Sequence, residues 1–244
     1  MSASFVLIVA TTALLNDSVN SGGSQVLVDA MLRAITVKPK YFQRVTAISE
    51  VKEDNNETLC VTTDGGADPN LADTPISSHK YSNIISTLPL SVLRTTVDLD
   101  DVHLSTGQKN GLRELLYSPS IKVGIQFRTA WWEKMGIIGG QSYTDRPTRS
   151  VVYPSHGPGL GNSNRSNVLI ASYNGMQDSQ RLAALMRGRN SAEEKILLNI
   201  IMKDLSVIHD KPLTELWEEY VDYFACDWYS NSFSLGEWAY VHGP

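Results

Sequence analysis

Histidine, serine and glycine are the residues whose spacing most often marks a metal or catalytic site. The five histidines never stand four residues apart, the spacing that places two ligands on one helix face, so a zinc site has little support. They are His79, His103, His156, His209 and His242. No Gly-x-Ser-x-Gly segment marks the strand-to-helix turn of a serine hydrolase. The glycine-rich stretch 157–161 runs into Asn162-Ser163-Asn164, so we expect a surface loop there and no phosphate-binding loop.

Lys122 is a charged residue within an apolar stretch, residues 121–127, that is typical of a strand. Strand alternation places it on the face opposite Ile121 and Val123. Its ammonium group either extends to water or serves a buried site, and the residues alone leave both alternatives open.

Tyr173 presents a similar choice. It ends an unbroken apolar run, residues 168–172, that predicts a buried strand, and site residues often gather at strand ends. A tyrosine that covers a core with its hydroxyl in water is the alternative. The tandem pair Trp131 and Trp132 is expected in the core.

Composition limits the classes of function. The 244 residues are 42% hydrophobic and 19% charged, which is typical of a globular protein. A net charge of -5 and the lack of a basic run make nucleic acid an unlikely partner. Two cysteines are too few for a disulfide framework. The apolar run 5–15 has no preceding Lys or Arg and is shorter than the ~20 residues of a membrane span, so we expect a buried helix there. The compartment, cytoplasmic or secreted, stays open.

The helices and strands that must position these residues follow from the spacing of apolar residues and from the glycine, proline and capping residues at the ends of the segments. Residues 22–25 form a glycine turn that opens an amphipathic helix ending before Pro39. Strands are expected at 44–48, 58–62, 82–87, 121–127, 150–153 and 168–172, with a loop at 67–79. Helices are expected at 105–116, at 178–187, from the Ser191 capping box to Ile208, and from Pro212 towards Phe224, with irregular structure from 226 to 244. This order predicts a mixed α/β fold of sheets covered by helices.

Taken in order, several segments resemble the flavin-dependent amine oxidase family, and most closely the L-amino acid oxidases of fungal and snake-venom type. The resemblance is collinear over most of the chain, and its order and spacing are more specific than any single motif. The segments are 22–25, 44–48, 81–89, 120–123, 127–133, 139–142, 144–147 and Asp227-Trp228.

The resemblance implies a partial FAD-binding domain at residues 1–103, a substrate-binding domain at 104–225, and a return towards the FAD domain at 226–244. It implies oxidative deamination of an L-amino acid by FAD and oxygen, which yields a keto acid, ammonia and hydrogen peroxide. The partners it implies are the amino acid and oxygen, with no nucleic acid, membrane or metal and with a homo-oligomer left open.

Site residues carry over from the same resemblance. Lys122 matches the catalytic lysine that holds a water beside the flavin, Tyr173 matches the tyrosine that binds the substrate carboxylate, and Trp228 matches the tryptophan against the flavin ring. The remaining residues that the resemblance assigns to the cofactor are Gly22, Gly23, Ser24, Val45, Thr87 and Pro89.

The chain also departs from the family pattern. The Gly-x-Gly-x-x-Gly turn that binds the pyrophosphate, the acidic residue that binds the ribose and the arginine that pairs with the substrate carboxylate are absent, as is the closing flavin-binding segment. We therefore expect an internal part of an oxidase that is inactive alone. The alternative is a module that binds an amino acid or pairs with an oxidase subunit without chemistry.

Overall fold

The computed structural model describes residues 5–8, 25–53, 56–65, 76–154 and 166–241. Helices and strands mix along the chain, as the sequence predicts. The described residues form two compact units, the first of residues 5–8, 35–117 and 232–241 and the second of residues 25–34 and 118–231. The first unit holds β1 (Phe5–Ile8), β2 (Arg44–Glu53), β3 (Asn56–Asp64), β4 (Ser77–Tyr81), β5 (Asn83–Ser86), α2 (Leu90–Thr96), α3 (Thr106–Glu114), β6 (Leu115–Tyr117) and β12 (Ala239–Val241). The predicted domain boundaries fall after residues 103 and 225, and which unit binds which ligand stays a prediction.

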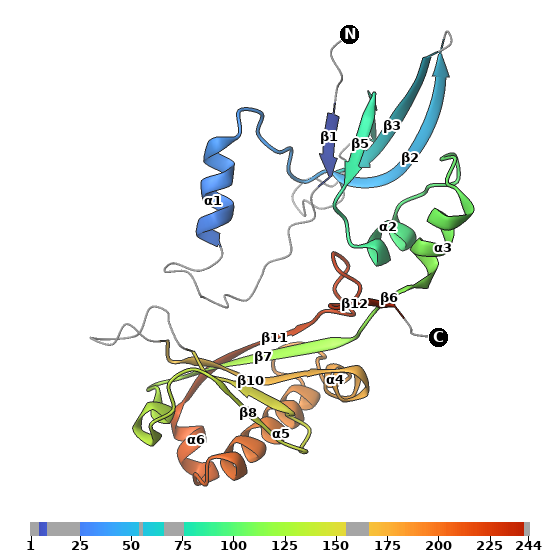
Figure 1. The fold of residues 1–244 in the computed structure, drawn as a ribbon. Coiled ribbons are helices and arrows are strands. Elements are labelled where there is room, and N and C mark those ends of the chain that lie inside the picture. The colour runs from blue at the N-terminus through green and yellow to red at the C-terminus, as the bar shows by residue number, and fades with distance from the viewer. Residues whose placement is uncertain (1–4, 9–24, 54–55, 66–75, 155–165, 242–244) are drawn as a thin grey trace. The chain divides into compact units, whose positions relative to one another are not determined.

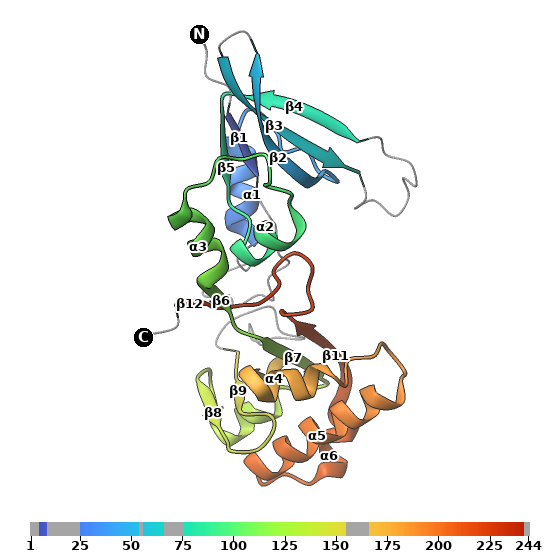
Figure 2. The ribbon, with the colours of Figure 1, turned by 90° about the vertical axis from the view of Figure 1, so that its right-hand side faces the viewer.

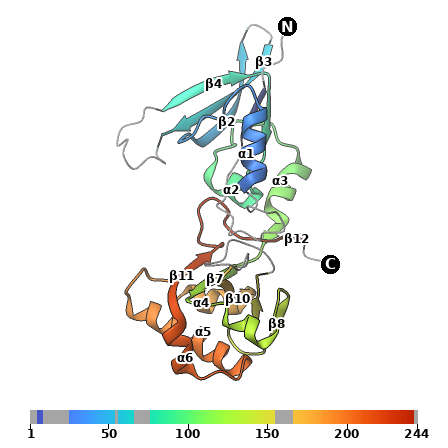
Figure 3. The same ribbon diagram turned by 90° about the vertical axis from the view of Figure 1, so that its left-hand side faces the viewer.

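The first unit combines three small sheets. Strands β2, β3 and β4 form an antiparallel sheet (Figure 3). Strands β1 and β5 run parallel side by side (Figure 1), and β6 pairs with β12. Its buried apolar cluster consists of Ile48, Val61 and Val97, with Val45 and Leu88 packed against it.

Three predictions within this unit are wrong in part. The apolar run at the start of the chain is a strand over Phe5–Ile8, where an unbroken apolar run suits a parallel strand, and its remainder lies outside the described residues. Ser77–Tyr81 is strand β4 rather than the end of a loop, because its backbone pairs with β3. Helix α3 begins where predicted, with Ser105 as its cap, but ends at Glu114, since the next residues pair with β12.

The second unit is built on a five-stranded antiparallel sheet of order β11-β7-β10-β9-β8. Helices α5 and α6 lie against one face of this sheet (Figure 1 and Figure 2). The unit holds α1 (Gln25–Ala34), β7 (Ser120–Phe127), the short 3-10 helix η1 (Trp131–Met135), β8 (Gln141–Tyr143), β9 (Ser150–Val152), β10 (Val168–Gly175), α4 (Met176–Ala183), α5 (Ala192–Ile208), α6 (Leu213–Glu219) and β11 (Tyr220–Asp227).

The core of the second unit forms between the sheet and α5. Alternate residues of β7 face this core and are fully buried, namely Ile121, Val123, Ile125 and Phe127. Leu197, Ile201 and Leu205 recur every four residues along α5, so one face of the helix packs on the sheet. Trp131 and Trp132 are buried in the same core, which confirms their predicted place.

Helix α5 begins at the predicted Ser191. The Ser191 hydroxyl accepts a hydrogen bond from the Glu194 backbone N–H at 3.0 Å, as in a capping box. The Glu194 carboxylate, however, accepts from the backbone N–H of Asn190 instead of that of Ser191. The cap therefore reaches one residue further towards the preceding turn than the motif predicts.

Strand β11 is the largest departure from the sequence prediction. The helix from Pro212 ends at Glu219, and Tyr220–Asp227 pairs with β7 where we expected a continuing helix and then irregular structure. The run is rich in tyrosine, phenylalanine and valine, which favour strands, and Tyr223 and Ala225 pack against the core. This strand completes the sheet beside β7.

Strand β10 contains a β-bulge. Ile170 pairs with Gly124 and Ser172 pairs with Val123, so Ala171 is an extra residue between them. As a result Ala171 and Ser172 are both fully buried, while Ile170 and Tyr173 are both partly exposed. No helix within the described ranges has the length and apolar character needed to cross a membrane.

Candidate functional site

Lys122 lies in β7, between β11 and β10 in the second unit's sheet. Its neighbours Ile121 and Val123 are fully buried while Lys122 is partly exposed, which confirms the predicted alternation. Helices α5 and α6 cover the face of Ile121 and Val123, so Lys122 projects from the other face, which we call the open face of the sheet.

Two of the predicted site residues lie beside the Lys122 ammonium. Lys122 Nζ is 4.5 Å from the centroid of the Tyr173 ring and 6.0 Å from that of the Trp228 ring. Tyr173 is directly opposite Lys122 across the β10–β7 pair, and Trp228 directly follows β11. A cation close to aromatic faces is attracted by their quadrupoles. The structure thus brings Lys122, Tyr173 and Trp228 together on one face.

Hydrogen bonds anchor the strand ends that carry these three residues. The backbone N–H of Trp228 donates to the Ser120 carbonyl at 3.0 Å, and the Ser120 hydroxyl donates to the Asn174 carbonyl at 3.1 Å. The Asn174 side-chain amide donates to the Pro147 carbonyl at 3.0 Å. Because Ser120 and Asn174 are buried, these bonds are shielded from water and hold the ends of β7, β10 and β11 in one arrangement.

A buried carboxylate fixes the segment that follows β8. Asp204 of α5 is 2% exposed and accepts from Arg146 Nε at 2.6 Å, from the Thr148 hydroxyl at 2.7 Å and from the Thr148 backbone N–H at 3.1 Å. The Thr148 carbonyl in turn accepts from the Ser172 hydroxyl at 3.0 Å. The segment 144–147, one carrier of the sequence resemblance, is therefore tied to α5 beneath the strand that bears Tyr173.

His209 closes the C-terminal end of α5. Its Nδ1 donates to the Leu205 carbonyl at 2.7 Å, and its Nε2 accepts from the Tyr153 hydroxyl at 2.6 Å. The Tyr153 hydroxyl also lies 2.8 Å from the Ser142 hydroxyl. Burial lowers the pKa of His209, so the neutral ring with its proton on Nδ1 fits these partners. This series of hydrogen bonds links Ser142 and Tyr153 through His209 to the end of α5 and supports the core there.

The predicted cofactor residues of the first unit lie around its small core. Val45 is partly buried in β2, while Thr87 and Pro89 connect β5 to α2. Leu88 between them packs against the same cluster as Val45. Gly22, Gly23 and Ser24, like the glycine-rich stretch 157–161, lie outside the described residues.

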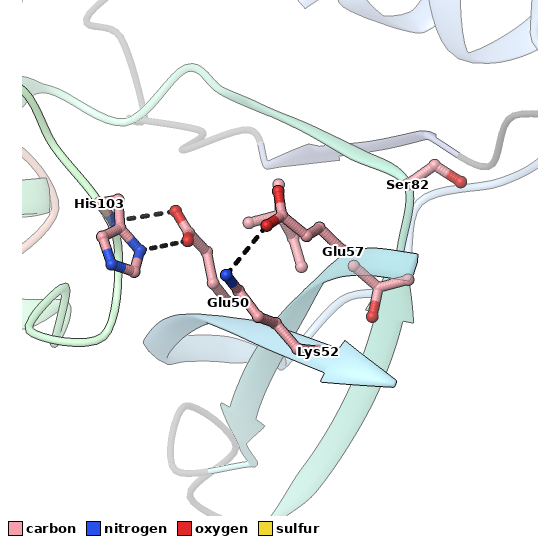
Figure 4. Close-up of a pocket in the computed structure, with 7 residues that line it drawn as sticks. Glu50, Lys52, Glu57, Ser82 and His103 are labelled. Atoms are coloured by element: carbon pink, nitrogen blue, oxygen red, sulfur yellow. Dashed lines mark hydrogen bonds and ion pairs between the residues drawn. The ribbon is translucent and has the colours of Figure 1, made fainter. Parts of the chain in front are cut away.

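A pocket of about 530 Å³ opens in the first unit (Figure 4), and it is lined by Glu50, Lys52, Glu57, Thr58, Leu59, Ser82 and His103. The His103 backbone N–H donates to Glu50 Oε1 at 2.8 Å and its Nδ1 lies 2.5 Å from Oε2, contacts that lower the pKa of Glu50. Lys52 and Glu57 form an exposed ion pair at 3.1 Å. These acids and bases satisfy one another and tie the segment at His103 to β2, so the pocket has a structural explanation without a ligand.

The sequence reasoning missed the contribution of β11 to the open face. Cys226 is directly opposite Lys122 on the side away from Tyr173, and its thiol is partly buried. Phe224 is opposite Gly124, which is two residues after Lys122 on the same face of β7. If residues 220–227 had been recognised as a strand, its alternation would have turned Tyr223 and Ala225 to the core. The same alternation would have placed Phe224 and Cys226 on the open face.

Comparisons with known proteins agree with the collinear segments. The chain matches the model of the family described as flavin containing amine oxidoreductase over residues 2–243. L-amino-acid oxidase 4 of Hebeloma cylindrosporum is 40% identical over an alignment of 198 residues that covers 75% of this chain and 31% of that protein. A flavin-dependent L-tryptophan oxidase of Lentzea aerocolonigenes is 30% identical over 164 residues, which are 67% of this chain and 31% of that protein. The matched region thus spans about a third of the length of these relatives.

Solved structures show a similar fold. A structure of putrescine oxidase bound to putrescine aligns with a TM-score of 0.62 at 19% sequence identity, covering 90% of this chain and 42% of that one. A triple mutant of putrescine oxidase aligns with a TM-score of 0.64 at 20% identity over the same shares. The likeness at this level of identity concerns the mixed α/β fold.

Proposed function

Because the chain belongs to the flavin containing amine oxidoreductase family, we propose that it serves the oxidative deamination of an L-amino acid, with FAD as the flavin and oxygen as the oxidant. The products are a keto acid, ammonia and hydrogen peroxide, formed from the amino acid, oxygen and water. The observation that carries the proposal is the Lys122 ammonium beside Tyr173 and Trp228 on the open face of β7. The 40% identity to an L-amino-acid oxidase supports an amino acid over another amine as the substrate.

The residues on the open face fit a flavin and an amino acid. Trp228 offers a large ring, which suits stacking beside a planar cofactor, and Lys122 and Tyr173 offer hydrogen-bond donors beside it. When bound, the flavin accepts the hydride equivalent from the substrate α-carbon. The Val45 backbone and the Thr87 to Pro89 segment of the first unit would contact the cofactor, as would Gly22, Gly23 and Ser24.

Lys122 is the proposed catalytic residue. Its ammonium group would hold a water by a hydrogen bond at the reacting centre, and this water would take part in proton transfer and in hydrolysis of the imine product. The buried neighbours Ile121 and Val123 fix the strand beneath it, so the charge needs little rearrangement as the reaction proceeds.

Tyr173 is the proposed substrate-binding residue. Its hydroxyl would donate a hydrogen bond to the substrate carboxylate, a charged acceptor for which such bonds are strong. The cross-strand pairing with Lys122 sets the distance between the carboxylate contact and the catalytic ammonium. The two roles together would orient the α-carbon of the amino acid.

The proposal is tested on a flavin-loaded protein that contains this chain together with the FAD-binding segments of a matched oxidase, assayed for peroxide release from a panel of L-amino acids and from putrescine. We expect peroxide from amino acids, saturable with substrate concentration, and none from putrescine. Oxidation of putrescine alone would show that the proposed amino acid specificity is wrong. Binding of amino acids by calorimetry without peroxide would support the alternative, a binding module without chemistry.

A further inference from the structure

Two polar residues flank Tyr173 in strand β10. Tyr173 lies on the open face, so its neighbours Ser172 and Asn174 point to the opposite face, where they are 0% and 6% exposed. Asparagine is disfavoured in strands, so its presence in this one needs a specific cause. Buried polar side chains are hydrogen-bonded as a rule, and their partners show what the two residues do.

Strand β10 has little backbone pairing around these residues on the side of β9. In the part of the chain that the structure describes, β9 pairs with β10 at one position, Ile170 opposite Val152. The β-bulge at Ala171 also interrupts the pairing with β7 just before Ser172. After the bulge, β10 therefore has regular backbone pairing only on the side of β7.

Side-chain donors act on the side of β9 in place of backbone donors. The Ser172 hydroxyl donates to the Thr148 carbonyl at 3.0 Å, and the Asn174 amide donates to the Pro147 carbonyl at 3.0 Å. The same amide lies 3.4 Å from the Ser172 hydroxyl, which links the two side chains. Because the buried carboxylate of Asp204 holds Thr148, the segment just before β9 is a fixed support.

Asn174 joins this support to β7 as well. Its backbone carbonyl accepts from the buried hydroxyl of Ser120 at 3.1 Å. Its side-chain Oδ1, however, is buried without a hydrogen-bond partner among the described residues. An unpartnered buried acceptor lowers stability, so removal of this amide should cost less stability than removal of a fully bonded one. The main effect of the amide is then on where the strand lies.

We propose that Ser172 and Asn174 are positioning residues, which fix Tyr173 beside Lys122 by joining β10 to the segment before β9. Both side chains are buried on the face opposite the open face, so they act through the backbone of Tyr173. The inference rests on the proposed function in one respect, namely that the Tyr173 hydroxyl binds the substrate carboxylate. The place of the Tyr173 ring beside Lys122 does not depend on that function, so the two can be tested separately.

The first test follows the Lys122 side chain by NMR in this chain without flavin. Protons above the face of an aromatic ring resonate upfield, so the ε-methylene signal of Lys122 should stand apart from those of exposed lysines. Its absence from the spectrum of Lys122→Met identifies it. In Ser172→Ala and in Asn174→Ala we expect this signal to move towards those of the exposed lysines, because the Tyr173 ring is held less firmly.

Ser179→Ala is the matched control. Ser179 is 1% exposed, and its hydroxyl donates to the Met176 carbonyl at 2.7 Å within α4. Like Ser172→Ala, the substitution removes one buried hydroxyl bonded to a backbone carbonyl, but it leaves the bonds beside Tyr173 intact. The Lys122 signal should stay in place. An unmoved signal in Ser172→Ala and Asn174→Ala, or an equal movement in Ser179→Ala, would overturn the positioning role and leave the proposed function intact.

The second test measures steady-state kinetics on the flavin-loaded protein. A carboxylate contact that is equal in the ground and transition states acts on KM rather than on kcat. We therefore expect Asn174→Ala to raise the KM for L-amino acids about tenfold, while kcat changes much less. In Tyr173→Phe the hydroxyl is already absent, so the further change Asn174→Ala should raise KM little more.

The double variant also provides the outcome that would contradict the proposal. If the two effects on KM multiply, Asn174 does not act through Tyr173, and its positioning role is overturned. An unaltered flavin-loaded protein that oxidises no amino acid would overturn the proposed function and the expected effect on KM. The NMR comparison would still decide in that case whether Ser172 and Asn174 fix Tyr173 beside Lys122.

Discussion

Lys122 brings its ammonium group to 4.5 Å from the Tyr173 ring centroid, on a strand whose inner face is fully buried. Methionine at residue 122 keeps the length and aliphatic packing of the side chain and removes the charged donor. We expect Lys122→Met to slow flavin reduction or reoxidation by roughly 100-fold, because a preorganised donor acts mainly on the transition state. Flavin affinity should change much less. Stopped-flow absorbance measures both half-reactions.

Lys203→Met is the matched control for this substitution. Lys203 lies on α5 in the same unit and is exposed, so its loss alters the net charge equally without touching the open face. Its flavin kinetics should equal those of the unaltered protein. Equal rates in Lys122→Met as well would remove the assigned catalytic role of Lys122.

Tyr173 offers a narrower test, since phenylalanine retains the ring beside Lys122 and removes the hydroxyl alone. Loss of a hydrogen bond to a charged acceptor costs about 1.5–3 kcal/mol, so we expect Tyr173→Phe to raise the KM for amino acids about 10- to 150-fold. Steady-state kinetics with two or more amino acids measures this change. A KM that stays constant would place the carboxylate contact elsewhere.

Helix α5 and its C-terminal cap carry two of the buried polar groups of the second unit, and the first is Asp204. Asparagine there would keep the size of the side chain but lose the charged acceptor for Arg146 and one acceptor position for Thr148. We expect Asp204→Asn to lower the free energy of unfolding by about 1–3 kcal/mol, measured by urea denaturation. Asp210→Asn, at an exposed residue in the left-handed conformation that asparagine tolerates, should have little effect.

The second group is His209, which makes the free energy of unfolding depend on pH. Burial holds the pKa of His209 below its usual value of 6.5, so the unfolded chain takes up the proton at a higher pH than the native one. Protonation of His209 in the unfolded chain therefore lowers the free energy of unfolding only below about pH 6.5. The decrease is at most about 1.4 kcal/mol per pH unit. The free energy of unfolding should fall from pH 7 to pH 5.5 more steeply in the unaltered protein than in His209→Gln. Parallel pH profiles would show that His209 does not contribute.

The elements that the sequence predicts well are those whose periodicity and caps agree. Strand β7 and helix α5 form at the expected residues, because each has one continuous apolar face and α5 has Ser191 as its cap. Strands β4 and β11 escape prediction, since their polar residues weaken the apolar pattern and their pairing partners lie far along the chain. The site was predicted only through the resemblance, because the contact between Lys122 and Trp228 depends on the pairing of β7 with β11.

Among the residues whose side chains the structure describes, the two units differ in the size of their buried apolar clusters. The second unit buries a continuous cluster that joins β7 and β10 to α5, whereas the buried cluster of the first unit consists of Ile48, Val61 and Val97. Since stability rises with buried apolar area, we expect the slowest amide hydrogen exchange in β7 and α5 and faster exchange in β2 and β3. Exchange followed by mass spectrometry tests this order. Equal protection in both units would indicate that they open together as one cooperative body.

The β-bulge in β10 has a consequence for how the chain can vary in length. Ala171 is the extra residue between Ile170 and Ser172, and without it the two strands would pair in regular alternation. A deletion of Ala171 would therefore leave Ile170 opposite Gly124 and Tyr173 opposite Lys122. A deletion in the regularly paired part of the strand, at Asn174 for example, would instead turn the residues on one side of it to the other face. Among descendants of a common ancestor, the bulge is the place in this strand where a single codon could be lost while the open face keeps its order.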